Sequence, residues 1–406
     1  MPIDTHVPVV LFNADTHAAL GVLRSLGRLG VPVYCIDRNP RALPLKSRYC
    51  SGRFIWDYER HSSEALVDYL IHVAAVVSGK PVLLPMFDLW NNFADDYRTV
   101  LAAHYRVTAP RSGAIARLYS KRGLYELCIS EGVPTADSYF PTTLQDACQA
   151  AQRLGFPVAI KAIDPNRLLR RTGRRLAVAR DDAQLVSIYQ EFDEPGHSNL
   201  FLQRYISGEQ KKEWICSSYF DRDARCRFAI SAIKLRQVPI SGGNTAHAVT
   251  APCEPLAERI RRIAQAAGYH GVLDADFCFD PQDGQYKLLD LNPRLGANFR
   301  VGVDRHGLDA VRCWYLDLTG QQIPDVRPEW GRTWVAEDTD YWACGELMRV
   351  GRLRLHELLA SWRGASEFAW WASDDLRPSL AFATTLAKLV AVTATRRIRR
   401  QGTARQ

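Results

Sequence analysis

The first 110 residues alternate continuous apolar runs with amphipathic segments. Val7–Phe12 is wholly apolar, which predicts a strand buried on both faces. Asp15 or Thr16 can cap a helix over Ala18–Leu29, and Gly30 lies just past its end. The alternation continues through the expected strand Val31–Asp37, helix Ala65–Val77 and strand Pro81–Met86. This β-α-β-α-β order predicts an α/β fold that begins with a Rossmann-like parallel sheet over residues 1–112.

The turn after the first strand does not carry a dinucleotide-binding motif. Asn13–His17 lacks the GxGxxG pattern that lets a pyrophosphate approach the backbone. Asp37, at the end of the second strand, could bind a ribose, but a strand-end carboxylate beside Arg38 fits the same pattern. The sequence therefore does not predict NAD.

Beyond residue 112 the pattern changes to helices followed by alternating strands. Helices are expected over Ala114–Ser130, Leu144–Leu154 and Ala183–Glu191. The expected strands are Val158–Lys161, Leu176–Ala179, Asn199–Tyr205, Trp214–Tyr219, Arg227–Lys234, Gly271–Phe279 and Tyr286–Leu291. We divide this part into residues 113–200, residues 201–320 and a C-terminal extension over 321–406.

The C-terminal extension contains an apolar stretch, Leu380–Thr395, that ends at an arginine cluster. It is shorter than the roughly 20 residues needed to span a bilayer. A last helix packed on the body with a basic tail is the favoured interpretation. The alternative is a peripheral membrane contact in which the helix and its arginines meet anionic lipid.

Composition and charge narrow the function classes. The chain has 406 residues, with 47% hydrophobic and 24% charged, as in an ordinary globular protein. The net charge of +8 comes from five arginines within Arg167–Arg175 and five in the last eleven residues. The rest of the chain is close to neutral, so we expect no general nucleic-acid binding. Ten cysteines without a CxxC or CxxH pair, and a start unlike a secretory signal, predict reduced thiols and a cytoplasmic location.

The most informative segment is a pair of acidic strands near residue 280. Asp276 precedes a hairpin near Pro281–Gly284, and Asp290 and Asn292 follow it on one face of the next strand. If the hairpin brings Asp276 opposite that strand, three oxygen ligands of the kind that Mg²⁺ prefers converge. Arg294 faces the same way and could stabilise charge at a reacting centre.

Asp276 with Asp290-x-Asn292-Pro293-Arg294 resembles the magnesium motif of the ATP-grasp superfamily, within its carboxylate–amine ligase branch and nearest to D-aspartate ligase-like enzymes. The family often has Glu where this chain has Asp276 and Asp290. The resemblance implies two α+β lobes that clasp ATP behind the Rossmann-like domain. The implied cofactors are ATP and Mg²⁺, with Mn²⁺ as an alternative metal.

The resemblance also implies nucleotide-binding residues. Lys161 matches the lysine that contacts the ATP phosphates, and Lys121 an earlier lysine near the nucleotide, although an exposed helix lysine is an equal interpretation. The hinge strand whose backbone binds adenine matches Gln203, Arg204, Tyr205 and Ile206, with Gln203 where relatives often have Glu. Glu213 could reach the ribose or a metal, or be a plain surface carboxylate.

Arg236 precedes the Gly242-Gly243 loop and matches the family's arginine that holds the substrate carboxylate or acyl phosphate. A hairpin turn beside an arginine is the alternative. Substrate contacts from Asn298 and Arg300 are weaker expectations. Where relatives have a glycine-rich lid, this chain has the run Arg167–Arg175, which could cover the phosphates or be an ordinary solvated run.

The expected function is ATP- and Mg²⁺-dependent ligation of a small-molecule carboxylate to an amine through an acyl phosphate. Arg294 and Arg236 are the expected catalytic residues. The alternatives are an ATP-grasp kinase that phosphorylates a hydroxyl and a non-catalytic ATP-binding protein associated with a membrane. A homodimer would be usual for the family. The sequence does not identify the acid or the amine.

Overall fold

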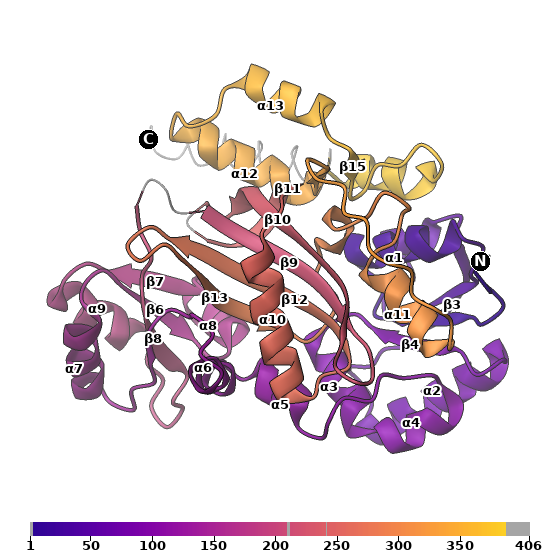
Figure 1. Ribbon diagram of the computed structural model, residues 1–406, viewed down its shortest axis with the longest axis horizontal. Coiled ribbons are helices and arrows are strands. Elements are labelled where there is room, and N and C mark those ends of the chain that lie inside the picture. The colour runs from indigo at the N-terminus through magenta and orange to yellow at the C-terminus, as the bar shows by residue number, and fades with distance from the viewer. Residues whose placement is uncertain (1–2, 209–211, 241, 387–406) are drawn as a thin grey trace, which may run out of the picture.

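The computed structural model describes residues 3–208, 212–240 and 242–386, which form three β-sheets (Figure 1). The N-terminal sheet is parallel and has the strand order β3-β2-β1-β4. Its strands are β1 (Val9–Phe12), β2 (Val33–Asp37), β3 (Cys50–Ile55) and β4 (Val82–Pro85), accompanied by α1 (His17–Gly27), η1 (Leu43–Lys46), α2 (Ser63–Val77), α3 (Asp88–Asp96) and α4 (Arg98–His104). The predicted Rossmann-like sheet is confirmed.

Two local features of this sheet follow from its chemistry. Thr16 caps α1, because its hydroxyl accepts from the Ala19 amide. Asp37 accepts from the Ala14 amide at 2.8 Å and from Asn39, so its carboxylate closes the turn after β1. The sequence pattern missed β3, an edge strand whose residues alternate between half-buried and exposed and so form no continuous apolar run.

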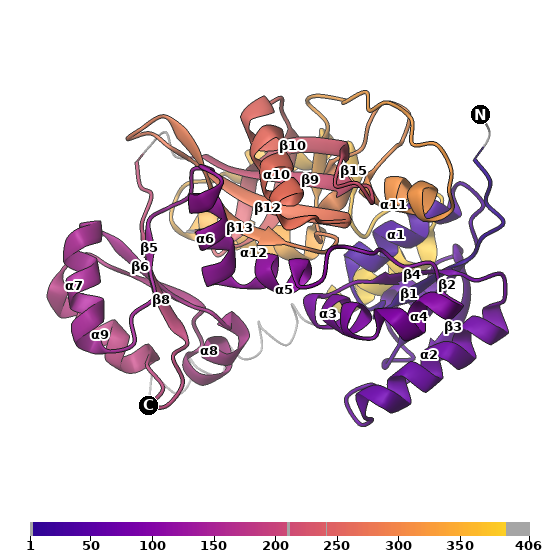
Figure 2. The same ribbon diagram turned by 60° about the horizontal axis from the view of Figure 1, so that its bottom comes forward.

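The small sheet is antiparallel, in the order β5-β8-β6-β7. Its elements are β5 (Ser138–Tyr139), α7 (Leu144–Leu154), β6 (Val158–Ala162), α8 (Pro165–Thr172), β7 (Leu176–Ala179), α9 (Asp182–Phe192) and β8 (Leu200–Arg204). The buried face of α7 and of α9 packs on Val158, Ile160 and Leu202 of the sheet. The alternate residues Ala159, Lys161 and Gln203 are left for the other face, which turns toward the central sheet (Figure 2).

The central sheet has seven strands in the order β13-β12-β9-β10-β11-β14-β15. They are β9 (Lys212–Phe220), β10 (Cys226–Val238), β11 (Asn244–Thr250), β12 (Gly271–Asp280), β13 (Gln285–Asn292), β14 (Thr333–Val335) and β15 (Glu367–Phe368). Helices α5 (Ala114–Tyr119), α6 (Lys121–Ser130) and α10 (Glu254–Ala267) form one core with it. A second core joins the sheet to α1 and α11 (Ala310–Leu318), with η2 (Phe299–Val301) beside them.

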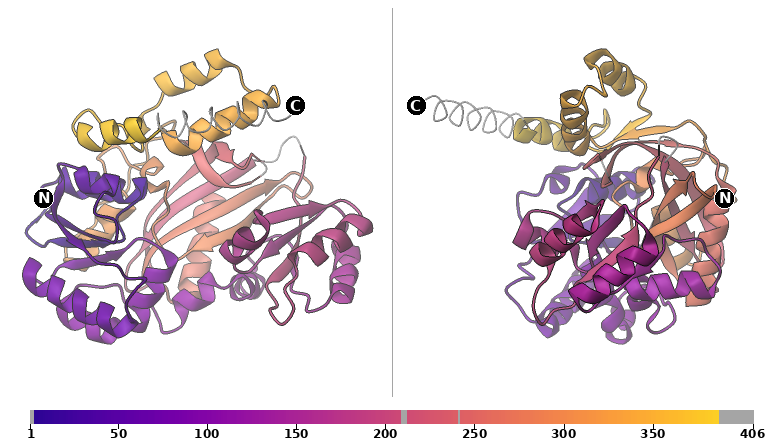
Figure 3. Two further views of the ribbon diagram at one scale, coloured as in Figure 1. Left: turned by 180° about the vertical axis from the view of Figure 1, so that it is seen from behind. Right: turned by 90° about the vertical axis from the view of Figure 1, so that its left-hand side faces the viewer.

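The C-terminal extension completes the central sheet and runs along one side of the molecule (Figure 3). β14 pairs with β11, β15 pairs with β14, and α12 (Glu337–Arg349) and α13 (Leu355–Arg363) lie between these two strands in the sequence. Residues 376–386 are helical. Most of the predicted helix Leu380–Thr395 and the arginine tail lie outside the described residues. Among the described residues, no helix has the length and apolar character needed to cross a membrane.

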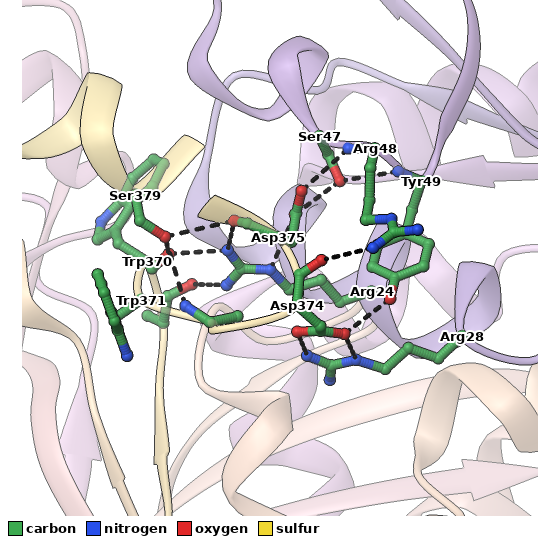
Figure 4. A network of polar contacts seen from close by, with 12 residues as sticks. Arg24, Arg28, Ser47, Arg48, Tyr49, Trp370, Trp371, Asp374, Asp375 and Ser379 are labelled. Atoms are coloured by element: carbon green, nitrogen blue, oxygen red, sulfur yellow. Dashed lines mark hydrogen bonds and ion pairs between the residues drawn. The ribbon is translucent and has the colours of Figure 1, made fainter. Parts of the chain in front are cut away.

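Residues 370–379 of the extension contact α1 of the N-terminal domain through a network of hydrogen bonds and ion pairs (Figure 4). Arg24 donates to the carbonyls of Ala369 and Trp370, at 3.1 and 2.8 Å, and forms an ion pair with Asp375 at 3.1 Å. Arg28 binds Asp374 through two nitrogens, each at 2.8 Å. The first helix and the last described segment are thereby joined directly.

Candidate active site

A pocket of about 260 Å³ lies between the small sheet and the central sheet. The central sheet and the β10–β11 loop line it with Lys234, Gly242, Gly243, Asn244, Cys278 and Leu289, in addition to predicted residues. The predicted site residues that line it are Lys161, Gln203, Arg204, Tyr205, Ile206, Glu213, Asp276 and Asp290. The structure therefore brings these eight predicted residues together in one place, whereas the predicted nucleotide residue Lys121 and the predicted metal ligand Asn292 do not line the pocket.

The predicted metal ligands lie on paired strands. Asp276 of β12 stands opposite Asp290 of β13, and Asn292 is two residues further along the same strand. The side chains of cross-strand partners share one face of a sheet, so all three oxygen donors point the same way.

A lysine binds each of the two carboxylates. Lys234 Nζ lies 2.6 Å from Asp276 Oδ1, and Lys121, at the start of α6, forms an ion pair with Asp290. Burial opposes the charge of Asp290, but Lys121 holds its pKa below the usual value, so it remains a carboxylate. Within residues 3–386, apart from the gaps at 209–211 and 241, no three His, Cys, Asp or Glu side chains form a ready-made metal cluster. Two carboxylates and an amide nevertheless fit Mg²⁺, which keeps much of its coordination shell for phosphate and water.

Asp274 is a further buried carboxylate beside these residues, and the sequence analysis missed it. It pairs with Asn292 across the strands, and its Oδ1 has no hydrogen-bond partner in the described part of the chain. Burial and the neighbouring charge of Asp276 raise its pKa to about 7. Gly296 packs against it so closely that a Cβ there would lie 2.3 Å from the carboxyl carbon. The two-residue spacing from Asp276 was the signal that could have found it.

Lys161 is held by a short chain of hydrogen bonds across the small sheet. Its Nζ donates to Gln203 Oε1 at 2.6 Å, and Gln203 Nε2 donates to the Ser138 hydroxyl at 3.0 Å. Ser138 in turn donates to the carbonyl of Ala136 at 2.9 Å. The ammonium group therefore stands at the pocket wall in a defined position, where a compact cation can offset phosphate charge.

The hinge residues Gln203, Arg204, Tyr205 and Ile206 all line the pocket. Arg204 lines the pocket, but its guanidinium turns to the β12–β13 hairpin, where it donates to Asp280 at 2.6 Å and to Gln282 at 2.8 Å. These contacts join the small sheet to the central sheet at the hinge. Glu213 lines the pocket from β9, next to Cys278 of β12.

Arg294 links the metal residues to the N-terminal sheet. Its Nε donates to Asp88 of α3 at 3.0 Å, and Asn91 of the same helix donates to the Pro293 carbonyl. Burial opposes its charge, but Asp88, Asp274 and Asp290 raise the pKa of the Arg294 guanidinium above its usual value. Arg294 thus places a cation near the carboxylates, but it does not line the pocket, and its catalytic role stays a prediction.

Arg236 lies elsewhere than the sequence led us to expect. It is bound by Asp340 of α12, and it does not line the pocket. The expectation rested on the Gly242-Gly243 loop that follows Arg236 and on the family resemblance. Strict two-residue alternation along β10 would place Arg236 on the same face as Lys234. Register shifts on both sides of Arg236 break that alternation, so Lys234 faces the pocket and Arg236 faces α12.

The two other residues predicted to contact substrate, Arg300 and Asn298, bind side chains of this protein. Arg300 binds Glu367 through two nitrogens, each at 2.7 Å, and Asp309 through a third contact. Asn298 donates to Thr245 at 3.0 Å. The structure therefore assigns Arg300 to the attachment of β15 and places Asn298 beside β11.

The arginine-rich run begins in α8, continues past its end at Thr172, and packs on the end of α9. Arg167 binds Glu194, Arg174 binds Glu191, and Arg171 donates to the backbone carbonyls of Phe192 and Asp193. These three side chains are thus occupied on the outside of the small sheet. The structure favours the solvated charge run over an arginine cover for the phosphates.

The fold resembles those of solved enzymes that were crystallised with nucleotides. The biotin carboxylase of Campylobacter jejuni, solved as a β,γ-ATP complex, has a TM-score of 0.63 with 17% identity, over 81% of this chain and 75% of that one. The N5-carboxyaminoimidazole synthetase of Staphylococcus aureus, solved with ADP, has a TM-score of 0.61 with 15% identity, over 82% of each chain. The chain has the ATP-grasp fold.

Sequence comparison relates this ATP-grasp chain to ligases. No family model matches it. The D-aspartate ligase of Enterococcus faecium is 24% identical over 255 residues, which cover 58% of each protein. The C-terminal section of the carbamoyl phosphate synthase large chain of Methanopyrus kandleri is 22% identical over 236 residues, covering 56% of this chain and 42% of that protein. The chain thus spans about half the length of these relatives.

Proposed function

We propose that this protein is an ATP- and Mg²⁺-dependent ligase that joins a carboxylate to an amine through an acyl phosphate and releases ADP and phosphate. The cross-strand pair Asp276–Asp290, at the wall of a pocket that Lys161 and the hinge also line, carries the proposal. The names of the sequence relatives, D-aspartate ligase and carbamoyl phosphate synthase, support it.

In the proposed reaction a substrate carboxylate oxygen attacks the γ phosphorus, and the bond between that phosphorus and the β–γ bridging oxygen breaks to release ADP. An amine then attacks the acyl carbon, loses a proton and expels phosphate. Bound Mg²⁺, held by Asp276, Asp290 and Asn292, would supply charge neutralisation between the β and γ phosphates. Catalysis in such a site is mainly positioning and electrostatic stabilisation.

Different residues of this protein bind the nucleotide and stabilise the developing charge in the proposed reaction. The backbone at Gln203–Ile206 binds the base, Glu213 the ribose, and Lys161 the phosphates. Arg294 stabilises the charge that develops on the transferred group and on the tetrahedral oxyanion, because a guanidinium beside buried carboxylates is already desolvated and fixed. Lys121 and Lys234 balance the charge of the two metal-binding carboxylates.

ADP release, screened over a panel of carboxylates with and without amines, tests the proposal. We expect Asp290→Ala or Asn292→Ala to abolish ADP production while the fold persists, because each removes an oxygen donor from the metal site. Asp283→Ala is the matched control, since Asp283 lies on the same hairpin and is bound by Lys287 and by the Gln285 amide, away from the proposed metal site. Full turnover by Asp290→Ala would contradict the metal assignment.

Trapping with hydroxylamine separates ligation from phosphotransfer. An acyl phosphate gives a hydroxamate, whereas a phosphorylated hydroxyl does not. ADP release without hydroxamate would favour the ATP-grasp kinase, which uses the same metal residues. A homodimer and membrane contact through the C-terminal tail stay predictions.

A further inference from the structure

Helices α12 and α13 of the C-terminal extension bind the strand that carries Lys234. Arg236 Nε and NH2 lie 2.6 and 2.7 Å from the two carboxylate oxygens of Asp340, whose side chain is 0% exposed. Trp362 of α13 donates to Asp340 at 2.7 Å, and Arg236 also donates to Ser361 at 3.1 Å. Asp340 thus gathers β10, α12 and α13 around one buried charge.

The stretch of β10 that Asp340 holds leads directly into the pocket. Lys234, two residues before Arg236, contacts Asp276 at 2.6 Å and donates to the Gly243 carbonyl at 3.3 Å. The β-bulge between Lys234 and Arg236 turns these two side chains to different partners. A few residues later, Glu346 of α12 accepts from the Ile240 amide at 3.4 Å.

We propose that the C-terminal extension positions residues of the nucleotide pocket and that Asp340 is the residue through which it does so. Through Arg236, Asp340 fixes the bulge in β10 and so aims Lys234 and the Gly242–Gly243 loop into the pocket. The proposal rests on the proposed function only in taking the pocket to be a nucleotide site.

The energetics of buried ion pairs favour a positioning role over a purely stabilising one. Two charges lose their hydration on burial, so replacing a buried pair by apolar side chains of similar volume often leaves stability unchanged or raises it. Removing one partner leaves the other unpaired and is costly. A double replacement can therefore remove the positioning without a large loss of stability.

The test measures binding of MgADP by calorimetry to the full chain carrying Arg236→Met with Asp340→Leu. We expect Kd to rise about tenfold or more, with the urea midpoint of unfolding close to that of the wild type. The matched control is Arg28→Met with Asp374→Leu, which removes a two-bond ion pair of the same extension at a distance from the pocket. The control should bind MgADP as the wild type does.

Trp362→Phe is a milder second variant, for use if the double variant fails to fold. It removes one hydrogen bond to Asp340 and keeps the ion pair, and we expect a smaller rise in Kd without a change in the unfolding midpoint. Wild-type affinity in both the double variant and Trp362→Phe would overturn the positioning role. Absence of MgADP binding by the wild type would instead overturn the proposed function itself.

Discussion

The side chains around Lys161 illustrate how single residues fix the direction of each hydrogen bond. The Ser138 hydroxyl donates to a carbonyl, so it can only accept from the amide nitrogen of Gln203. The amide oxygen is then left for Lys161, which has only donors. A glutamate at position 203 could also accept from Lys161, but it could not donate to Ser138. The glutamine therefore adds no negative charge of its own beside the lysine.

Replacing Ser138 by alanine should loosen this chain without touching the pocket wall. We expect Ser138→Ala to raise KM for ATP about three- to tenfold, equivalent to roughly 1 kcal/mol for a lost neutral hydrogen bond, with a smaller effect on kcat. Steady-state kinetics of ADP release measure both constants. Ser198→Ala, in the loop just before β8 and with a 3.5 Å contact to the Pro141 carbonyl, is the control. Equal KM values in the two variants would contradict the proposed role of the hydrogen bonds that connect Ser138, Gln203 and Lys161.

Strand register decides which face of an element reaches the pocket. The β12–β13 hairpin pairs Asp276 with Asp290, as the spacing in the sequence predicts. On β10 the register shifts around Arg236 redirect that side chain to α12. Alternation along a strand is thus a sound guide only where the ladder is regular.

The loop between β10 and β11 is tight at Gly243. A Cβ at this position would lie 2.0 Å from the Val238 carbonyl oxygen, so the backbone would have to move. We expect Gly243→Ala to destabilise the protein by about 1–3 kcal/mol, as overpacking does, and to weaken MgADP binding. Urea unfolding and calorimetry measure the two effects.

Gly345→Ala, in α12, is the contrasting substitution. Its Cβ would meet no atom within 4 Å, and alanine is the better helix former, so stability should be unchanged or higher by up to about 1 kcal/mol. MgADP affinity should not change. Similar losses in Gly243→Ala and Gly345→Ala would show that the tight loop has no special role.

At the scale of the whole molecule, the C-terminal extension holds three parts of the chain together. It adds strands to the central sheet, anchors β10 through Asp340 and binds α1 of the N-terminal sheet (Figures 1 and 4). Glu337 at the start of α12 also accepts from the backbone amides of Trp370 and Trp371. The parts are therefore expected to unfold together.

The two arginines of α1 should contribute very differently to this attachment. Arg24 is buried and binds Asp375 and two carbonyls, so Arg24→Met leaves buried acceptors unpaired and should cost about 3–5 kcal/mol. The Arg28–Asp374 pair is one-third exposed, and solvent screening limits Arg28→Met to about 1 kcal/mol or less. Urea unfolding of the two variants checks the order, and equal losses would contradict it.

Acid should weaken the same attachment through Asp374. Hydrogen bonds from Arg28 and Tyr49 hold the pKa of Asp374 well below its usual value of 3.8. A lowered folded-state pKa gives stability that is present above 3.8 and is lost as the pH falls below it. We expect Asp374→Asn to lower Tm by about 1–3 °C at pH 6 and to match the wild type more closely at pH 3. A constant difference at both pH values would contradict the assignment.

The sequence predicted most of the strands and helices near the site, but it missed one strand and one buried carboxylate. The parallel strands and the β12–β13 hairpin were readable because buried strands form apolar runs and because Asp276, Asp290 and Asn292 have diagnostic spacing. The edge strand β3 was missed because it has no continuous apolar run. The buried Asp274 was missed although its two-residue spacing from Asp276 places both side chains on one face of β12.

The order of residues alone predicted the Rossmann-like parallel sheet, because hydrophobic periodicity acts between near neighbours. Through the resemblance of its Asp276 and Asp290-x-Asn292-Pro293-Arg294 motif, it also predicted the ATP-grasp fold. The partner of each charge was decided only by the tertiary structure. Arg236 meets Asp340, more than one hundred residues later, and Arg24 meets Asp375 from the other end of the chain. Such contacts depend on how the sheets bend and where the extension returns, and no local pattern in the sequence encodes those distances.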